Sequence, residues 1–121
     1  MATRGSGART KGALGEREVS AILTTLLGVE IKRKLGASRD GGDDLATDDF
    51  SFEVKRQERL RITEWMEQAV ENSSSTGAMP VLVFRQSRQP WRVVLDLTEF
   101  CMLAKAWLAA KEHDDDIGGK Y

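Results

Sequence analysis

Apolar and polar side chains alternate in one segment near the middle of the chain. Over residues 50–55, Phe-Ser-Phe-Glu-Val-Lys, an apolar side chain recurs at every second position. This is the period of a strand that buries one face and leaves the other half-exposed. Glu53 and Lys55 share the wetter face of the predicted strand. A carboxylate and an ammonium group are therefore expected to project side by side.

The residues just upstream predict a hairpin. Residues 44–47 can form an antiparallel partner strand, with Asp48-Asp49 as a two-residue turn, although this pair lacks the glycine that favours such turns. Folding back brings Asp44 toward Glu53, a geometry that can hold a divalent cation through carboxylate oxygens. The alternative is a solvated hairpin with ordinary surface charges. Gly41-Gly42 favour the site, because paired glycines permit positive φ and the close approach of a phosphate.

The first helix is predicted from Thr10, after a flexible basic arm over residues 1–9, to a C-terminal cap at Gly28. Its apolar residues recur at spacings of three and four. At ~100° per residue, Glu16 lies about 50° from the centre of the apolar stripe and faces inward or nearly so, whereas Arg17-Glu18 point away from it. Glu16 is therefore either a carboxylate at the edge of the stripe that reaches water or a third acidic ligand.

Two further helices follow from the same periodicity. One begins at Thr63, which can cap it, and ends before a polar loop over residues 72–77. The other carries a clear apolar stripe and leads into an acidic flexible tail over residues 112–121. On this last helix we expect Trp107 to lie in the core and Cys101 to be a buried small apolar residue.

Three other segments have strand patterns. Residues 29–35 alternate, which predicts an amphipathic first strand with a basic outer row. Residues 80–85 are nearly all apolar, as expected of a central strand covered on both faces. A short strand over residues 91–95 follows a turn.

Composition limits the number of domains and the class of protein. The chain has 121 residues and a formal net charge of −1, which predicts one compact domain and argues against a generic nucleic-acid coat. No apolar run approaches the ~20 residues needed to cross a bilayer, so a soluble protein is expected. The basic start has no apolar segment that would mark it for secretion, and a single cysteine cannot form an internal disulfide. A reducing cytoplasm is the expected compartment.

Basic residues are unevenly distributed and give candidate phosphate contacts. Ser38 and Arg39 lie in the loop that leads to the acidic hairpin, and Arg85, Arg88 and Arg92 cluster around the last turn. Such residues can contact a phosphate backbone. A solvated hairpin tip is an equally good explanation of the three arginines.

Taken together, the order of elements resembles the PD-(D/E)XK nuclease superfamily: Glu on the first helix, Asp before the second strand and Glu-x-Lys on the third. Residues 11–17, Lys-Gly-Ala-Leu-Gly-Glu-Arg, are similar to the opening segment of archaeal Holliday-junction-cleaving enzymes. Residues 36–97 resemble small phage resolvase-like nucleases. The resemblance implies an α/β (α+β) fold with a restriction-endonuclease-like core, in which helices flank a central mixed sheet of about five strands. Residues 11–111 would form this single domain.

The resemblance also implies roles for individual residues. Glu16, Asp44 and Glu53 would bind Mg²⁺ or Mn²⁺, and Asp43 is the alternative to Asp44. Lys55 would orient or activate the attacking water, and Gln68 would support the site. Arg17 and Ser38 would lie near the scissile phosphate. The remaining residues expected to contact DNA are Lys11, Lys32, Lys34, Arg39, Arg56, Arg85 and Arg88.

The implied function is metal-dependent hydrolysis of DNA phosphodiester bonds. By this resemblance the protein is a Holliday junction resolvase of DNA recombination and repair, acting as a homodimer on four-way junctions and encoded by a phage for use in the host cytoplasm. A nicking, repair or general endonuclease of the same fold is the alternative among enzymes. A DNA-binding module that does not cleave is the alternative outside enzymes.

Overall fold

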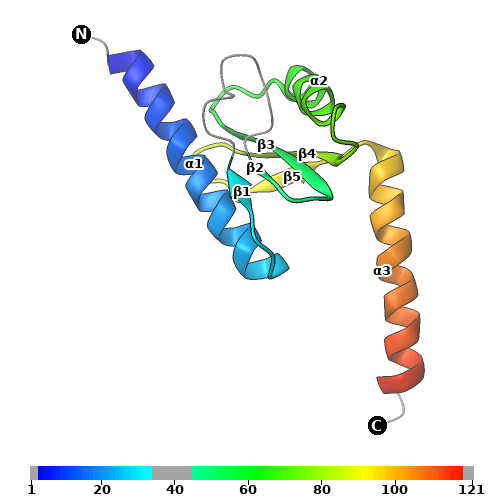
Figure 1. Cartoon of the computed structure of the whole chain (residues 1–121). Coiled ribbons are helices and arrows are strands. Elements are labelled where there is room, and N and C mark those ends of the chain that lie inside the picture. Colours follow the sequence, from blue (N-terminus) through cyan, green and yellow to red (C-terminus); the bar gives the residue numbers. More distant parts are fainter. Residues whose placement is uncertain (1–2, 34–44, 119–121) are drawn as a thin grey trace.

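The computed structural model describes residues 3–33 and 45–118, and within them the side chains of residues 12–33 and 45–114. A five-stranded sheet lies between two helices, and a third helix projects from the body (Figure 1). In chain order the elements are α1 (Thr3–Leu27), β1 (Lys32–Arg33), β2 (Leu45–Ala46), β3 (Phe50–Arg56), α2 (Ile62–Ser73), β4 (Met79–Arg85), β5 (Arg92–Val94) and α3 (Leu97–Gly118).

The sheet is mixed, and its strands lie in chain order from β1 to β5. The first three strands are antiparallel, with Leu45 opposite Phe52, and β5 is antiparallel to β4. Between them β3 and β4 run parallel, with Phe52 beside Val81, and α2 makes the crossover that parallel neighbours require. The predicted fold, a mixed sheet of about five strands flanked by helices, is confirmed.

Helices cover both faces of the central strands. On one face Val19 of α1 packs with Leu45, Phe52, Val54, Val81 and Val83. On the other, Trp65 of α2 lies against Phe84 of β4, with ring centroids 6.4 Å apart. The prediction of a half-exposed strand at residues 50–55 was therefore wrong. Because α2 covers the face that was expected to be wet, Glu53 is only 2% exposed.

The β2–β3 turn is stabilised by Thr47 rather than by a glycine. Its side-chain oxygen accepts hydrogen bonds from the backbone N–H groups of Asp49 (3.2 Å) and Phe50 (3.0 Å). The backbone N–H of Thr47 donates to the carbonyl of Phe50 at 2.9 Å. A threonine hydroxyl can hold a turn in this way. The predicted hairpin forms for this reason without the usual turn residue.

The helix boundaries differ from those predicted. The first helix begins at Thr3 and the last continues to Gly118, so much of the predicted arm and tail is helical. Once a helix is nucleated, each added residue needs little further stabilisation. The C-terminal cap at Gly28 is confirmed by its φ of 69°. The predicted cap at Thr63 is wrong, because Arg61 occupies the N-cap position of α2.

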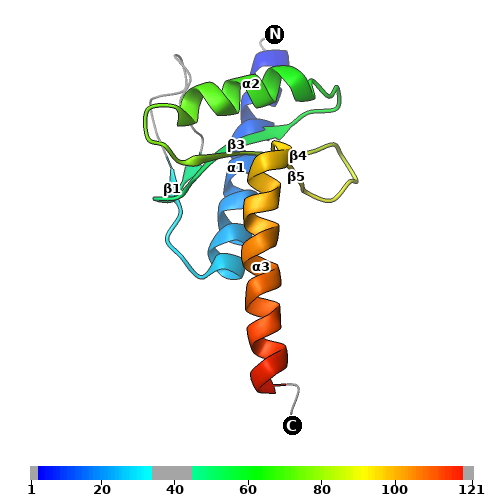
Figure 2. The same ribbon diagram turned by 90° about the vertical axis from the view of Figure 1, so that its right-hand side faces the viewer.

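Near its start, α3 turns away from the sheet and stands to one side of it (Figure 1), and its C-terminal part extends beyond all other elements (Figure 2). Trp107 is 62% exposed and Cys101 is also exposed, so the prediction that both are buried was wrong. The apolar stripe was real, but no other described element packs along it. No helix within residues 3–33 and 45–118 is both long enough and apolar enough to cross a membrane.

Candidate active site

Glu53 is the buried carboxylate at the centre of the candidate site. The side-chain amide of Asn72 donates a hydrogen bond to its Oε2 at 3.0 Å. The Nζ atom of Lys55 lies 3.4 Å from its Oε1. Removing a carboxylate from water costs several kcal/mol unless it is paired and hydrogen-bonded. The amide and the ammonium group offset that cost from two directions, and they also fix the orientation of the carboxylate.

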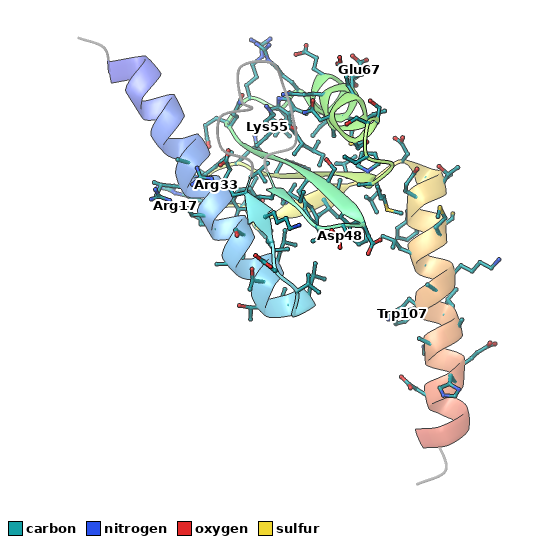
Figure 3. All side chains as sticks on the ribbon, in the orientation of Figure 1. Arg17, Arg33, Asp48, Lys55, Glu67 and Trp107 are labelled. Atoms are coloured by element: carbon teal, nitrogen blue, oxygen red, sulfur yellow. The ribbon has the colours of Figure 1, made fainter. Side chains whose placement is uncertain are left out.

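Two elements position these groups. The period of β3 places Glu53 and Lys55 on one face, two residues apart. The helix α2 covers that face, and its buried Trp65 and Ala69 fix which side of the helix meets the sheet. Asn72 lies near the C-terminal end of α2, above β3. Figure 3 shows Lys55 on the same side of the sheet as α2.

Asn72 is not among the predicted site residues, because the sequence pattern places it after the end of the second helix. Residues 72–77 were assigned to a loop, but α2 continues to Ser73. Gln68, the predicted site residue on this helix, is half-buried. It lies one turn before Asn72 on the same side of α2. The spacing from Gln68 to Asn72 could have pointed to Asn72, since residues four apart on a helix face the same neighbour.

Glu16 has a different partner. Its Oε2 is 3.0 Å from the Nε atom of Arg33 on β1, and its side chain is 22% exposed. Arg33 is paired with Leu45 across the β1–β2 ladder. Within residues 3–33 and 45–118, no three His, Cys, Asp or Glu side chains form a group that could hold a metal ion. Asp44 and its alternative Asp43 lie outside the described residues.

Glu18 joins α1 to β4 and to the segment before β5, although the helical wheel placed it away from the apolar stripe. Its Oε2 accepts a hydrogen bond from Nε1 of Trp91 at 2.9 Å and lies 3.6 Å from Nη2 of Arg85. The guanidinium of Arg85 also lies over the Trp91 ring, 5.3 Å from its centroid. Arg85 is a predicted DNA contact, but its side chain is only 18% exposed and is engaged by these two residues.

Basic residues gather where the parallel strands end. Arg56 and Arg85 are neighbours at the carboxyl ends of β3 and β4, the edge at which parallel sheets generally bind ligands. Arg88 is exposed in the following turn, with a φ of 64°. Arg17 is exposed on the outer side of α1 (Figure 3), and Lys32 is exposed on β1.

Several predicted DNA contacts lie outside the described part of the chain. The side chain of Lys11 is one of these, although its backbone belongs to α1. The others are Lys34, Ser38 and Arg39.

The chemistry of the described groups suits a divalent cation and a phosphate. Carboxylate oxygens are the ligands that Mg²⁺ and Mn²⁺ prefer, and Glu53 offers two of them in a fixed position. The adjacent Lys55 ammonium can neutralise a phosphate oxygen. A rigid acidic group beside a positive charge, both carried by β3, is an arrangement that can bind and polarise a phosphodiester.

The chain is similar to proteins of one nuclease family. The family model described as "Phage putative PDDEXK endonuclease" matches residues 7–113. Among solved structures, the Holliday junction resolvase Hjc of Archaeoglobus fulgidus is similar, with 23% sequence identity and a TM-score of 0.54. The match covers 70% of this chain and 72% of that one, and it shows a common fold. No curated protein matches this chain in sequence.

Proposed function

Because the chain belongs to the phage PDDEXK endonuclease family, we propose that it is a divalent-metal-dependent DNA endonuclease whose reaction is centred on Glu53 and Lys55. The observation that carries the proposal is the Glu53 carboxylate, which is 2% exposed and contacted by Asn72 and Lys55. A protein that only bound DNA would gain nothing from burying a carboxylate beside phosphate, because the two repel each other.

Glu53 and Asp44 are the proposed metal ligands, with Glu16 as the third. Asp44 directly precedes Leu45, which is paired with Phe52, the neighbour of Glu53. Asp43 is the alternative. When bound, Mg²⁺ or Mn²⁺ would polarise the phosphate oxygens and acidify an attacking water. Glu16 would join by exchanging its Oε2 contact with Arg33 for the cation.

Lys55 and Asn72 have distinct proposed roles. Lys55 touches the reacting groups: its ammonium adds positive charge where negative charge accumulates on the phosphate in the transition state. Asn72 acts through Glu53, because its hydrogen bond holds the carboxylate in one orientation. Gln68, one turn earlier on α2, would donate to phosphate or water.

DNA would bind across the edge where β3 and β4 end. Exposed basic residues there and on α1 and β1 would contact phosphates, and binding would weaken as salt concentration rises. Arg85 would contact DNA only after release from Glu18. The other proposed contacts are Lys11, Arg17, Lys32, Lys34, Ser38, Arg39, Arg56 and Arg88.

For the substrate we propose a four-way junction, cut by a homodimer in the cytoplasm of a phage-infected cell. The support is the fold shared with Hjc, a Holliday junction resolvase, and the two equivalent strands that a junction offers to a two-fold dimer. A nicking, repair or general endonuclease would use the same groups on another DNA shape. These possibilities differ in substrate geometry and not in the chemistry at Glu53.

The test compares a labelled immobile four-way junction with linear duplex and single strand of the same sequence, in Mg²⁺, Mn²⁺ or EDTA. The variant is Glu53→Gln. Its matched control is Glu67→Gln, the same change at an exposed carboxylate on α2 that points away from the sheet (Figure 3). We expect metal-dependent symmetric nicks on the junction, lost in Glu53→Gln and kept in Glu67→Gln.

Other outcomes contradict parts of the proposal. Cleavage of all three DNAs would replace the resolvase with a general endonuclease. Tight junction binding without cleavage in any metal would favour a non-cleaving module. Full activity of Glu53→Gln would exclude Glu53 as the centre of the reaction.

A further inference from the structure

One face of α3 is apolar and exposed along several turns. The fractional exposure is 75% for Leu97, 56% for Phe100, 62% for Trp107 and 56% for Leu108. Because α3 projects from the body, no other described element packs along this face (Figures 1 and 2). Soluble monomers rarely expose so continuous an apolar patch. We call it the apolar face of α3, formed by Leu97, Phe100, Cys101, Ala104, Trp107 and Leu108.

The central residues of this face are arranged symmetrically along the helix. Phe100 and Leu108 are equally far from Ala104 in sequence, and so are Cys101 and Trp107. A segment with such spacing is complementary to its own copy when the two helices run antiparallel. We propose that the apolar face of α3 binds the same face of a second copy, in an antiparallel two-fold pair centred on Ala104.

In this pair, Phe100 meets Leu108 of the second copy, and Cys101 meets Trp107 of the second copy. The two Ala104 residues meet on the two-fold axis, where their small side chains permit close approach. Helices pack with axes ~8–10 Å apart, and their Cα atoms lie ~2.3 Å from each axis. At the far end of this range, two residues that face each other across the axis have Cα atoms about 5.4 Å apart, which is within disulfide distance.

The area is sufficient for a specific interface. With aromatic side chains offering roughly 150–250 Å² each, the exposed fractions leave on the order of 600 Å² of apolar side-chain surface on each copy. Pairing would bury about twice that, which is at the lower limit of specific interfaces. The area therefore favours a reversible dimer that depends on concentration.

Charge favours a second copy of this chain over DNA as the partner. Residue 111 falls opposite residue 97 of the second copy, so Lys111 approaches the partner's Asp96 at both ends of the symmetric pair. Lys111 already lies over its own Trp107 ring, 5.3 Å from the centroid. The same helix ends with Glu112 and Asp114 through Asp116, which repel a phosphate backbone.

The inference rests on α3 alone and not on the proposed nuclease activity. Its test reads molecular mass and cross-links in the full chain without DNA, so its outcome is separate from that of the cleavage assay. The first measurement is sedimentation equilibrium over a wide concentration range. We expect twice the chain mass at high concentration for wild type and for Met102→Glu. Trp107→Glu should have the mass of one chain, with an unchanged circular dichroism spectrum.

Met102 is the matched control because it is 63% exposed on the opposite side of α3. The second measurement uses the Cys101→Ser background with Ala104→Cys or Met102→Cys added. Under mild oxidation we expect a disulfide-linked dimer from Ala104→Cys only. A wild type that stays monomeric at all concentrations would overturn the proposal. Equal cross-linking of both variants, or a dimer that Ala104→Cys does not cross-link, would overturn the antiparallel pairing.

Discussion

The side-chain amide of Asn72 holds the buried carboxylate of Glu53 by a hydrogen bond of 3.0 Å, although the two residues belong to different elements. Lys55 approaches the other carboxylate oxygen from the same strand as Glu53. An amide and an ammonium group therefore fix one carboxylate from two sides. Such a group is oriented before any ligand binds, which lowers the cost of binding a cation or a phosphate there.

Asn72→Ala is expected to weaken Mn²⁺ binding and cleavage by about 10–100-fold, because groups that orient a metal ligand have effects of this size. Titration calorimetry with Mn²⁺ and without DNA measures the binding directly. Gln68→Ala is the matched control, since it removes an amide one turn earlier on α2. A larger loss of Mn²⁺ affinity in Gln68→Ala than in Asn72→Ala would assign the orienting role to Gln68.

Lys55→Met should reduce the single-turnover cleavage rate by about 10²–10³-fold, the usual effect of removing one charge from a transition state. Binding of uncleaved DNA should change only slightly. Arg56→Met removes the neighbouring positive charge and should weaken DNA binding and its salt dependence while leaving the cleavage step nearly intact. If the two variants behave alike in single-turnover assays, Lys55 is only one more phosphate contact.

The Arg33–Glu16 ion pair tests whether Glu16 is a metal ligand. The pair is partly exposed, with side chains 36% and 22% accessible, and such pairs contribute up to ~1 kcal/mol. Arg33→Met should therefore raise Mn²⁺ affinity by up to about fivefold, because it frees the Glu16 carboxylate. In a Glu16→Gln background the same change should have no effect. An equal gain in both backgrounds would exclude Glu16 from the metal site.

Two glycines of α1 give different expectations for stability. A Cβ added at Gly12 meets no atom within 4 Å, so Gly12→Ala should stabilise the fold by about 0.5–1 kcal/mol through helix propensity. At Gly15 the new Cβ would lie 3.3 Å from both Arg56 and Trp91.

Gly15→Ala should therefore gain less than Gly12→Ala, and Gly15→Leu should lose about 1–3 kcal/mol by overpacking. Urea unfolding measures both free energies. Equal stabilisation by the two alanine substitutions would mean that α1 does not pack closely on the sheet at Gly15.

The sequence predicted the features that depend on local pattern, namely where a strand lies and where a helix ends. The alternation at residues 50–55 located β3 and placed Glu53 beside Lys55, and Gly28 marked the end of α1. It could not show how deeply Glu53 is buried, because that depends on which element covers its face. Nor could it predict the contact between Glu18 and Trp91, which are 73 residues apart.

Trp107 illustrates a second limit. The periodicity of α3 indicated correctly that one face is apolar, and an apolar face is usually covered. Whether the cover comes from the same chain depends on the direction in which the helix leaves the sheet. The residue pattern of α3 does not determine that direction, so the prediction that Trp107 is buried was wrong.

The parallel pairing of β3 and β4 also determines when the centre of the molecule forms during folding. A tight turn cannot join two parallel strands. The hydrogen bonds between β3 and β4 therefore form only after α2 has connected the two strands. Glu53 and Asn72 meet only in that step. The two groups, which we propose as part of the reaction site, thus come together with the core and are held by its packing. Any adjustment to the shape of a bound DNA must therefore come from the periphery of the fold.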